Sequence, residues 1–215
     1  MSNAKGVEEA SKGPDWRELV AVLLLAVTAI VTAWTGFQAS KWSGAMSISF
    51  SQASSARIEA ARLEGVANRK QTVQVSLFTQ WLQAYQADDA ELTDFLASRF
   101  PEPLASTFPA WIEAQPLKDP QAPTTPFEMA AYVIPELGAA HQADDRADKK
   151  FAEALRNNQR GDNYTLLTVA FATVLFFGAL SGRMRGMRAQ WAFLVLGCIG
   201  FVASAGLLIA YPKLI

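Results

Sequence analysis

The chain has 215 residues, a formal net charge of −1 and a hydrophobic content of 51%, with 18% of its residues charged. This composition is more apolar than that of a typical soluble protein. A single histidine and a single cysteine supply few of the side chains that most nucleophilic catalysis and disulfide frameworks require. We expect no enzyme activity, no cofactor and no nucleic-acid partner.

The start of the chain predicts a tail followed by a membrane anchor. Residues 1–14 are small and polar, so we assign them to a disordered cytoplasmic tail. Residues 19–37 hold no Asp, Glu, Lys, Arg or His and are about long enough to cross a bilayer as a helix. This block is longer than the apolar core of a signal peptide, and its exit carries Trp34 and Trp42, which favours an uncleaved anchor.

Two further apolar blocks have the same character. Residues 165–182 and 191–210 also lack charged side chains and histidine. Tyr164, Trp191 and Tyr211 flank these blocks, and such aromatic residues favour membrane interfaces. The predicted fold class is therefore all-α, an integral membrane protein with three transmembrane helices. The predicted spans cover residues 15–37, 164–182 and 190–211.

The loop between the second and third spans sets the predicted orientation. Residues 183–189 contain three arginines and no acid, and short loops rich in Arg and Lys stay on the cytoplasmic side. This places the N-terminus in the cytoplasm. Residues 38–163 and residues 212–215 then lie on the far side of the membrane.

Residues 38–163 predict a long extracytoplasmic helical hairpin. From Trp42 onward, apolar or small residues recur at steps of three or four, which indicates a helix that continues from the first span to about Leu96. The start of this helix, residues 42–56, carries no charge and many small residues, so we predict a seam that packs against another helix or subunit. The interaction candidates on this seam are Trp42, Met46, Phe50 and Ala53.

The return of the hairpin is predicted to be helical too. The pattern runs from Leu137 into the second span, with Gly161 as a swivel and Asp162 as the cap of a restarted helix. Before it, residues 100–135 hold eight of the ten prolines, which predicts a compact tip with a short helix at residues 110–113. The aromatic residues of the tip fit a packed core or, alternatively, a binding surface. The candidates there are Trp111, Phe127 and Tyr132.

Four residues of the returning helix have the chemistry of metal ligands. His141, Asp144, Asp145 and Asp148 fall within two helical turns. Basic residues are interleaved with them, which is typical of an ordinary solvated helix face. We therefore predict no metal site and keep the four residues as weak candidates only.

Small residues recur within the second and third spans. Gly178 and Gly182 stand one helical turn apart, as do Gly200 and Ser204. This spacing lets helix backbones approach closely. It fits packing of the second span on the third, and it also fits a contact between subunits.

Three segments carry a resemblance to known proteins. The run from Ala33 to Ala39 leaves the first span, the run from Gly161 to Tyr164 enters the second, and residues 183–188 form the basic turn. In this layout the chain resembles uncharacterised bacterial inner-membrane proteins with one span, a long helical segment and two further spans. The resemblance implies the topology and a bacterial inner-membrane location, and it implies no activity or site residue.

These features favour a structural function. We expect a membrane-anchored helical scaffold or interaction protein, oligomeric, which presents its extracytoplasmic domain to a partner. Its partners are then the lipid bilayer and either further copies of the chain or another membrane protein. The alternatives are a sensor or regulatory subunit of a membrane complex, and an oligomeric channel. The side chains that line the pore in the channel hypothesis are Thr28, Thr32, Thr35 and Gln38.

Overall fold

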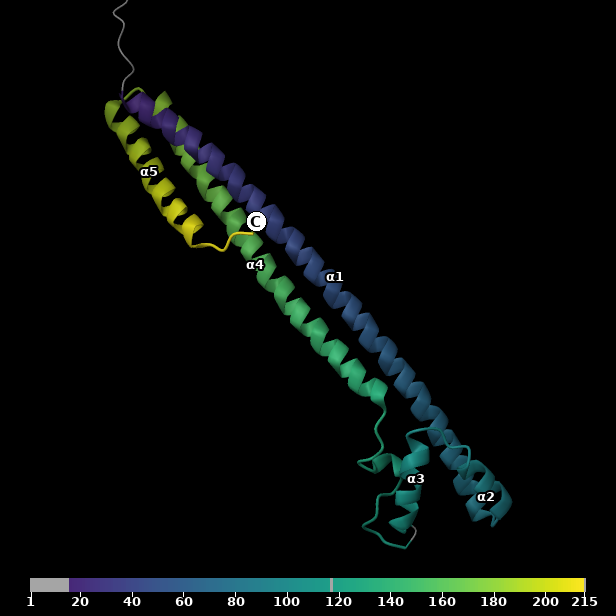
Figure 1. Cartoon of the computed structure of the whole chain (residues 1–215). Helices are drawn as coiled ribbons and strands as arrows, with labels where there is room; N and C mark the ends of the chain where they lie inside the picture. The colour runs from purple at the N-terminus through teal and green to yellow at the C-terminus, as the bar shows by residue number, and fades with distance from the viewer. Residues whose placement is uncertain (1–15, 117, 215) are drawn as a thin grey trace, which may run out of the picture. The chain divides into compact units, whose positions relative to one another are not determined.

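The computed structural model describes residues 16–116 and 118–214, and within these ranges the chain forms helices and no strand. This confirms the predicted all-α class. The helices in chain order are α1 (Trp16–Gln86), α2 (Ala90–Ala97), α3 (Leu104–Glu113), the 3-10 helix η1 (Pro126–Glu128), α4 (Pro135–Arg183) and α5 (Met187–Ala210) (Figure 1). The predicted tail, residues 1–14, lies outside the described residues.

The chain divides into two compact units. The first unit contains Met1–Ser49 and Ala152–Ile215. It therefore holds the N-terminal part of α1, the C-terminal part of α4 and all of α5. The second unit, Phe50–Phe151, holds the remaining parts of α1 and α4, with α2, α3 and η1 between them in sequence.

The helices of the first unit are apolar on their outward faces. α1, α4 and α5 each contain a stretch that is long and apolar enough to cross a membrane, as the sequence predicts. Ile30, Val202 and Ile209 are 72%, 70% and 76% exposed. Exposed apolar surface of this extent is unfavourable in water and suits a lipid environment.

The inward face of α1 in the first unit repeats every seven residues. The buried positions that follow this repeat are Ala21, Thr28, Thr35, Trp42 and Ser49. A seven-residue repeat keeps one seam of a helix against its neighbours over a long distance. The buried hydroxyls are satisfied by their own helix, as when Thr28 donates to the Leu24 carbonyl oxygen at 2.6 Å.

Gly161 serves close packing and does not interrupt a helix. α4 is continuous from Pro135 to Arg183, so the predicted swivel at Gly161 and the helix restart at Asp162 are wrong. A Cβ on Gly161 would lie 3.7 Å from both the Ala39 carbonyl oxygen and the Trp42 Cβ. Gly161 therefore lies where α4 packs closely on α1, at a distance that would also accommodate an alanine.

The second unit uses alanine where its two long helices meet. On α1, Ala53, Ala60 and Ala67 are at most 6% exposed and again follow a seven-residue repeat. On α4, Ala140 and Ala147 are at most 1% exposed. Alanine lets helices approach closely but buries little apolar area per residue. This unit therefore also depends on contacts beside the alanine seam and on a hydrophobic core at the end of α1.

α1 ends earlier than the sequence predicts. Its last residue is Gln86, whereas Leu96 belongs to α2, so the prediction of one helix reaching Leu96 is wrong. Asp88 has a φ of 55°, a left-handed conformation that ends a helix and that aspartate tolerates better than most residues. Asp89 then caps α2, because its carboxylate accepts a hydrogen bond from the Leu92 N–H at 3.0 Å.

The helix predicted at residues 110–113 is part of the longer α3. This helix begins at Leu104 and contains Pro109 in its interior. Proline removes one backbone hydrogen bond from a helix. The buried side chains of Leu104, Thr107 and Trp111 hold the helix in place, so tertiary packing outweighs the local cost of the proline.

We call residues 87–134 the connecting segment, and a hydrophobic core joins it to the end of α1. The rings meet largely edge to face, as for Phe78 and Trp111, whose centroids are 5.2 Å apart at 81°. Aromatic pairs prefer this geometry. The buried members of the core are Phe78, Trp81, Ala84, Leu96, Phe100, Leu104 and Trp111.

Candidate functional site

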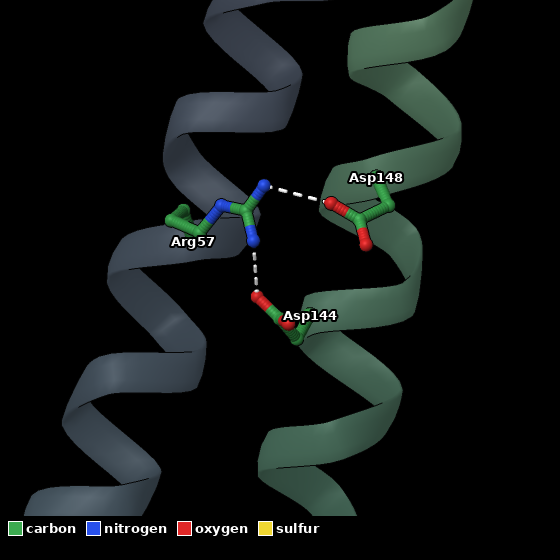
Figure 2. A network of polar contacts seen from close by, with 3 residues as sticks. All are labelled: Arg57, Asp144 and Asp148. Atoms are coloured by element: carbon green, nitrogen blue, oxygen red, sulfur yellow. Dashed lines mark hydrogen bonds and ion pairs between the residues drawn. The ribbon is translucent and has the colours of Figure 1, made fainter.

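Arg57 of α1 is bound by two aspartates of α4 in the second unit (Figure 2). Its guanidinium nitrogens lie 2.6 Å from Asp144 Oδ1 and 2.8 Å from Asp148 Oδ1. The two aspartates stand one helical turn apart, so they share a face of α4 and a planar guanidinium reaches both. The hydrogen bonds to Asp148 and Asp144 raise the pKa of Arg57. Arg57 therefore stays charged throughout the physiological pH range.

Two further ion pairs join the same helices. An Arg146 nitrogen lies 2.9 Å from Glu59 Oε2, and the Lys70 ammonium donates to Glu136 Oε1. The hydrogen bond from Lys70 lowers the pKa of Glu136. Partly exposed pairs of this kind contribute little to stability. Their value here is that they fix the register of α1 against α4 beside the alanine seam.

The four weak metal candidates do not form one site. Asp144 and Asp148 are held by Arg57, whereas His141 and Asp145 are exposed. Within residues 16–116 and 118–214, no three His, Cys, Asp or Glu side chains lie close enough to hold a metal ion. The cationic group that Asp144 and Asp148 bind is the guanidinium of Arg57.

The aromatic candidates of the connecting segment make the contacts of a hydrophobic core. Trp111 is 2% exposed and donates its Nε1–H to the Pro123 carbonyl oxygen at 2.9 Å. The Phe127 ring lies 5.1 Å from the Tyr132 ring, centroid to centroid. The Tyr132 hydroxyl is buried without a hydrogen-bond partner among the described residues, and burial raises its pKa. Trp111 in particular offers almost no surface to a binding partner.

Other residues of the connecting segment are apolar and exposed. On α2, Leu92 is 43% and Phe95 is 55% exposed, and the two stand one turn apart. The Arg99 guanidinium carbon lies 5.4 Å from the centroid of the Phe95 ring. Apolar and aromatic side chains that stay exposed beside an arginine are typical of protein interfaces. We call Leu92 and Phe95 the α2 surface.

The four interaction candidates on the seam predicted at residues 42–56 are buried or partly buried within the chain. In the first unit Trp42 is 5% exposed, and Met46 is half-buried. In the second unit the rings of Phe50 and Phe151 meet edge to face with centroids 5.4 Å apart, and Ala53 is buried. The sequence left open whether this seam packs against another helix or against a second subunit. Within each unit, the seam packs against α4.

Three of the four small residues singled out in the spans are in close contact. A Cβ on Gly178 would lie 2.9 Å from a leucine of α1, and one on Gly200 would lie 3.1 Å from a valine of α4. Ser204 is 6% exposed. A Cβ on Gly182, in contrast, would meet no described atom within 4 Å. Packing inside the chain accounts for Gly178, Gly200 and Ser204 but leaves Gly182 unexplained.

Gln38 makes a contact that the sequence did not indicate. Its side chain is fully buried, donates to the Leu214 carbonyl oxygen at 3.2 Å and accepts from the Leu214 N–H at 3.0 Å. The Tyr164 hydroxyl donates to the Pro212 carbonyl oxygen at 3.2 Å. These bonds fix residues 212–214 against α1 and α4. The sequence feature that could have indicated this contact is the position of an amide side chain, Gln38, just after an apolar block. The channel hypothesis assigned this side chain to a pore.

The geometry defines a class of protein. The described residues form helices and no strand, with three helices suited to crossing a membrane and a second unit that contains an aromatic core. Comparison with protein-family models, curated proteins and solved structures finds no match to this chain. The resemblance to bacterial inner-membrane proteins therefore stays a prediction, and function has to be inferred from the chain itself.

Proposed function

We propose that the chain is an integral protein of a bacterial inner membrane whose second unit acts as an interaction scaffold in the periplasm. The three apolar stretches and the exposed apolar side chains around them support insertion. The arginines between α4 and α5 support a cytoplasmic location for that connection. The connecting segment is separated by one span from the N-terminal tail and by one span from the arginines, so it then lies in the periplasm.

The α2 surface is the observation that carries the scaffold proposal. Leu92 and Phe95 are exposed on a helix whose neighbouring residue, Leu96, is anchored in the aromatic core. A rigid segment presents apolar side chains without the ordering cost that a flexible loop pays on binding. The partner that fits is an apolar protein surface, which a second copy of the same chain supplies.

The test is the mass of the detergent-solubilised protein, measured by light scattering after size exclusion. The wild-type particle should contain more than one copy, and the double variant Leu92→Ser with Phe95→Ser should contain one. The control Ile58→Ser changes a residue of α1 that is 68% exposed and should keep the wild-type mass. A single-copy wild type contradicts self-association. A double variant of unchanged mass contradicts the α2 surface as the contact.

A sensor function has one specific observation in its favour. A hollow of about 310 Å³ in the second unit is lined by Arg69, Lys70, Gln74 and Glu102, among others. Gln74 is 1% exposed, and its Oε1 has no hydrogen-bond partner among the described residues. A small polar solute with a donor for this oxygen would relieve a costly buried acceptor.

The sensor alternative is tested by a thermal-shift screen against free amino acids and small amines. Saturable stabilisation by one of them, abolished in Gln74→Leu and retained in Gln52→Leu, would favour the sensor. Gln52 is an exposed residue of the same helix. No stabilisation by any of these solutes would leave the scaffold as the better account.

A further inference from the structure

A cavity opens in the first unit where the start of α1, the end of α4 and the start of α5 meet. Its volume is about 400 Å³. Leu25 and Leu194 contribute apolar surface to it, and Arg17, Gln190 and Trp191 contribute polar and aromatic groups. The cavity thus combines apolar and cationic groups at one end of three apolar helices. A ligand that fits it has an apolar part and an anionic part.

Gly182 keeps this cavity open. The residue lines the cavity, and a Cβ there would meet no described atom within 4 Å. Gly178, one turn earlier, also lines the cavity but is pressed against Leu25. Close helix packing therefore explains Gly178 and does not explain Gly182. The absent side chain at Gly182 leaves space for a ligand.

Among the described residues at this end of the three helices, arginines outnumber acidic side chains. Arg17 and Glu18 both line it, which gives one charge of each sign. Arg183, Arg185 and Arg188 lie in or beside the short connection between the two helices that line the cavity, and all three are exposed. Guanidinium groups bind phosphate oxygens through paired hydrogen bonds. Among the described residues, this excess of positive charge favours an anion at this end of the helices.

The first backbone N–H groups of α5 lie within one helical turn of Gln190 and Trp191, which line the cavity. Gly186 precedes the helix, and none of the described side chains caps its N-terminus. The Gln190 amide, which also lines the cavity, donates to the Met184 carbonyl oxygen at 2.7 Å and fixes the connection. The first N–H groups of a helix attract anions, because they are unpaired and carry the positive end of the helix dipole.

We propose that this cavity binds the headgroup phosphate of an anionic phospholipid. The inference rests on the membrane insertion proposed above. The phosphate is held by Arg17 and by the arginines of the connection, beside the start of α5. The glycerol portion lies against Trp191, and the acyl chains follow the apolar outward faces of the helices. Basic pockets between transmembrane helices are suited to such headgroups.

The test is lipid retention by the full-length protein in detergent, measured by native mass spectrometry with added phosphatidylglycerol or phosphatidylcholine. The wild type should retain phosphatidylglycerol about tenfold better than phosphatidylcholine. Gly182→Leu fills the cavity and should remove this preference. Gly206→Leu is the matched control, because a Cβ on Gly206 also meets no described atom within 4 Å and this glycine does not line the cavity. It should behave as the wild type.

A second variant covers the case in which Gly182→Leu does not fold. Arg185 is exposed, so Arg185→Gln removes charge without filling space, and it should weaken phosphatidylglycerol binding by about fivefold. Equal retention of the two lipids by the wild type would overturn the proposal. So would an undiminished preference in Gly182→Leu, or displacement of the lipid by millimolar inorganic phosphate, which would assign the site to a soluble anion.

Failure of the lipid site is separable from failure of membrane insertion. Extraction of the membranes with alkaline carbonate reports insertion alone. A chain that remains in the membrane and shows no headgroup preference overturns only the lipid site. A chain that is released into the supernatant overturns the proposed insertion, and with it the lipid site.

Discussion

The two units are built on the same inward repeat and differ in what they turn outward. In the first unit, Thr28 and Thr35 are buried while Ile30 is 72% exposed. In the second unit, Ala60 and Ala67 are buried while Arg57 forms ion pairs on the outside. Both inner faces repeat every seven residues. The two units therefore differ in the polarity of their exposed side chains. Their buried faces share a repeat that reflects only helix packing.

The comparison also shows how each unit is held together. The first unit relies on glycine contacts and on hydroxyls that bond to their own helix, which suits a solvent in which apolar burial provides no driving force. The second unit has an aromatic core and ion pairs, which suit water. Substitutions at the residues that hold each unit together test this comparison most directly.

The largest effect is expected in the aromatic core of the second unit. Trp111→Ala should destabilise this unit by about 3–5 kcal/mol, because it leaves a cavity in a packed core. The neighbouring Ile112 is 42% exposed, so Ile112→Ala should cost less than about 0.5 kcal/mol. Pulse proteolysis of the full chain in urea measures both. Equal losses for the two variants would contradict the assignment of Trp111 to the core.

A smaller effect is expected where Gln38 holds residues 212–214. Gln38→Leu removes both side-chain bonds to Leu214 and should cost about 1–3 kcal/mol locally. Hydrogen exchange of the Leu214 amide should become fast, while exchange in Gln52→Leu should match the wild type. Persistent protection of that amide in Gln38→Leu would show that another group holds the segment.

Gly161→Ala should have the opposite sign. The added Cβ makes ordinary contacts of 3.6 to 3.7 Å with α1, so the first unit accepts it. Replacing glycine within a helix then stabilises the protein by up to about 1 kcal/mol. Gly200→Ala is the contrast, because its Cβ lies 3.1 Å from Val174 Cγ2 and the neighbour must move. Thermal unfolding in detergent should rank Gly161→Ala above the wild type and Gly200→Ala below Gly161→Ala.

The smallest effect belongs to the ion pair of Lys70 and Glu136. The hydrogen bond from Lys70 lowers the pKa of Glu136 in the folded protein. Its stabilising contribution is therefore present above the ordinary glutamate pKa of about 4.3 and is lost as the pH falls through the lower folded-state value. Glu136→Gln should flatten this part of the acid unfolding profile. A profile identical to that of the wild type would show that the pair adds nothing to stability.

The sequence predicted the helices of the first unit well, because the length of a charge-free block is set by the thickness of a bilayer. The apolar blocks at residues 19–37 and 165–182 lie within α1 and α4. The end of α1 was missed because a single residue, Asp88, turns the chain through a left-handed conformation, and no glycine or proline announces it. The prediction at Gly161 was wrong because the sequence does not distinguish a glycine at which a helix bends from a glycine at which another helix packs closely.

The candidate sites were harder to predict because they depend on register. Arg57 meets Asp144 and Asp148 only because α1 and α4 are aligned over the alanine seam, and nothing near Arg57 in sequence records that alignment. Gly182 was read as a packing residue by its spacing from Gly178. Its role in the cavity depends on where the side chains of α1 lie, which spacing along α4 does not encode.

The most direct test of the account is the accessibility of single cysteines on the two sides of the membrane. In a Cys198→Ala background, the exposed residues Ser98 and Arg185 are replaced one at a time by cysteine. A membrane-impermeant maleimide should label Ser98→Cys in cells with only the outer membrane opened. It should label Arg185→Cys only after the inner membrane is also opened. Labelling of Arg185→Cys when only the outer membrane is opened, or no labelling of Ser98→Cys under that condition, would contradict the proposed orientation.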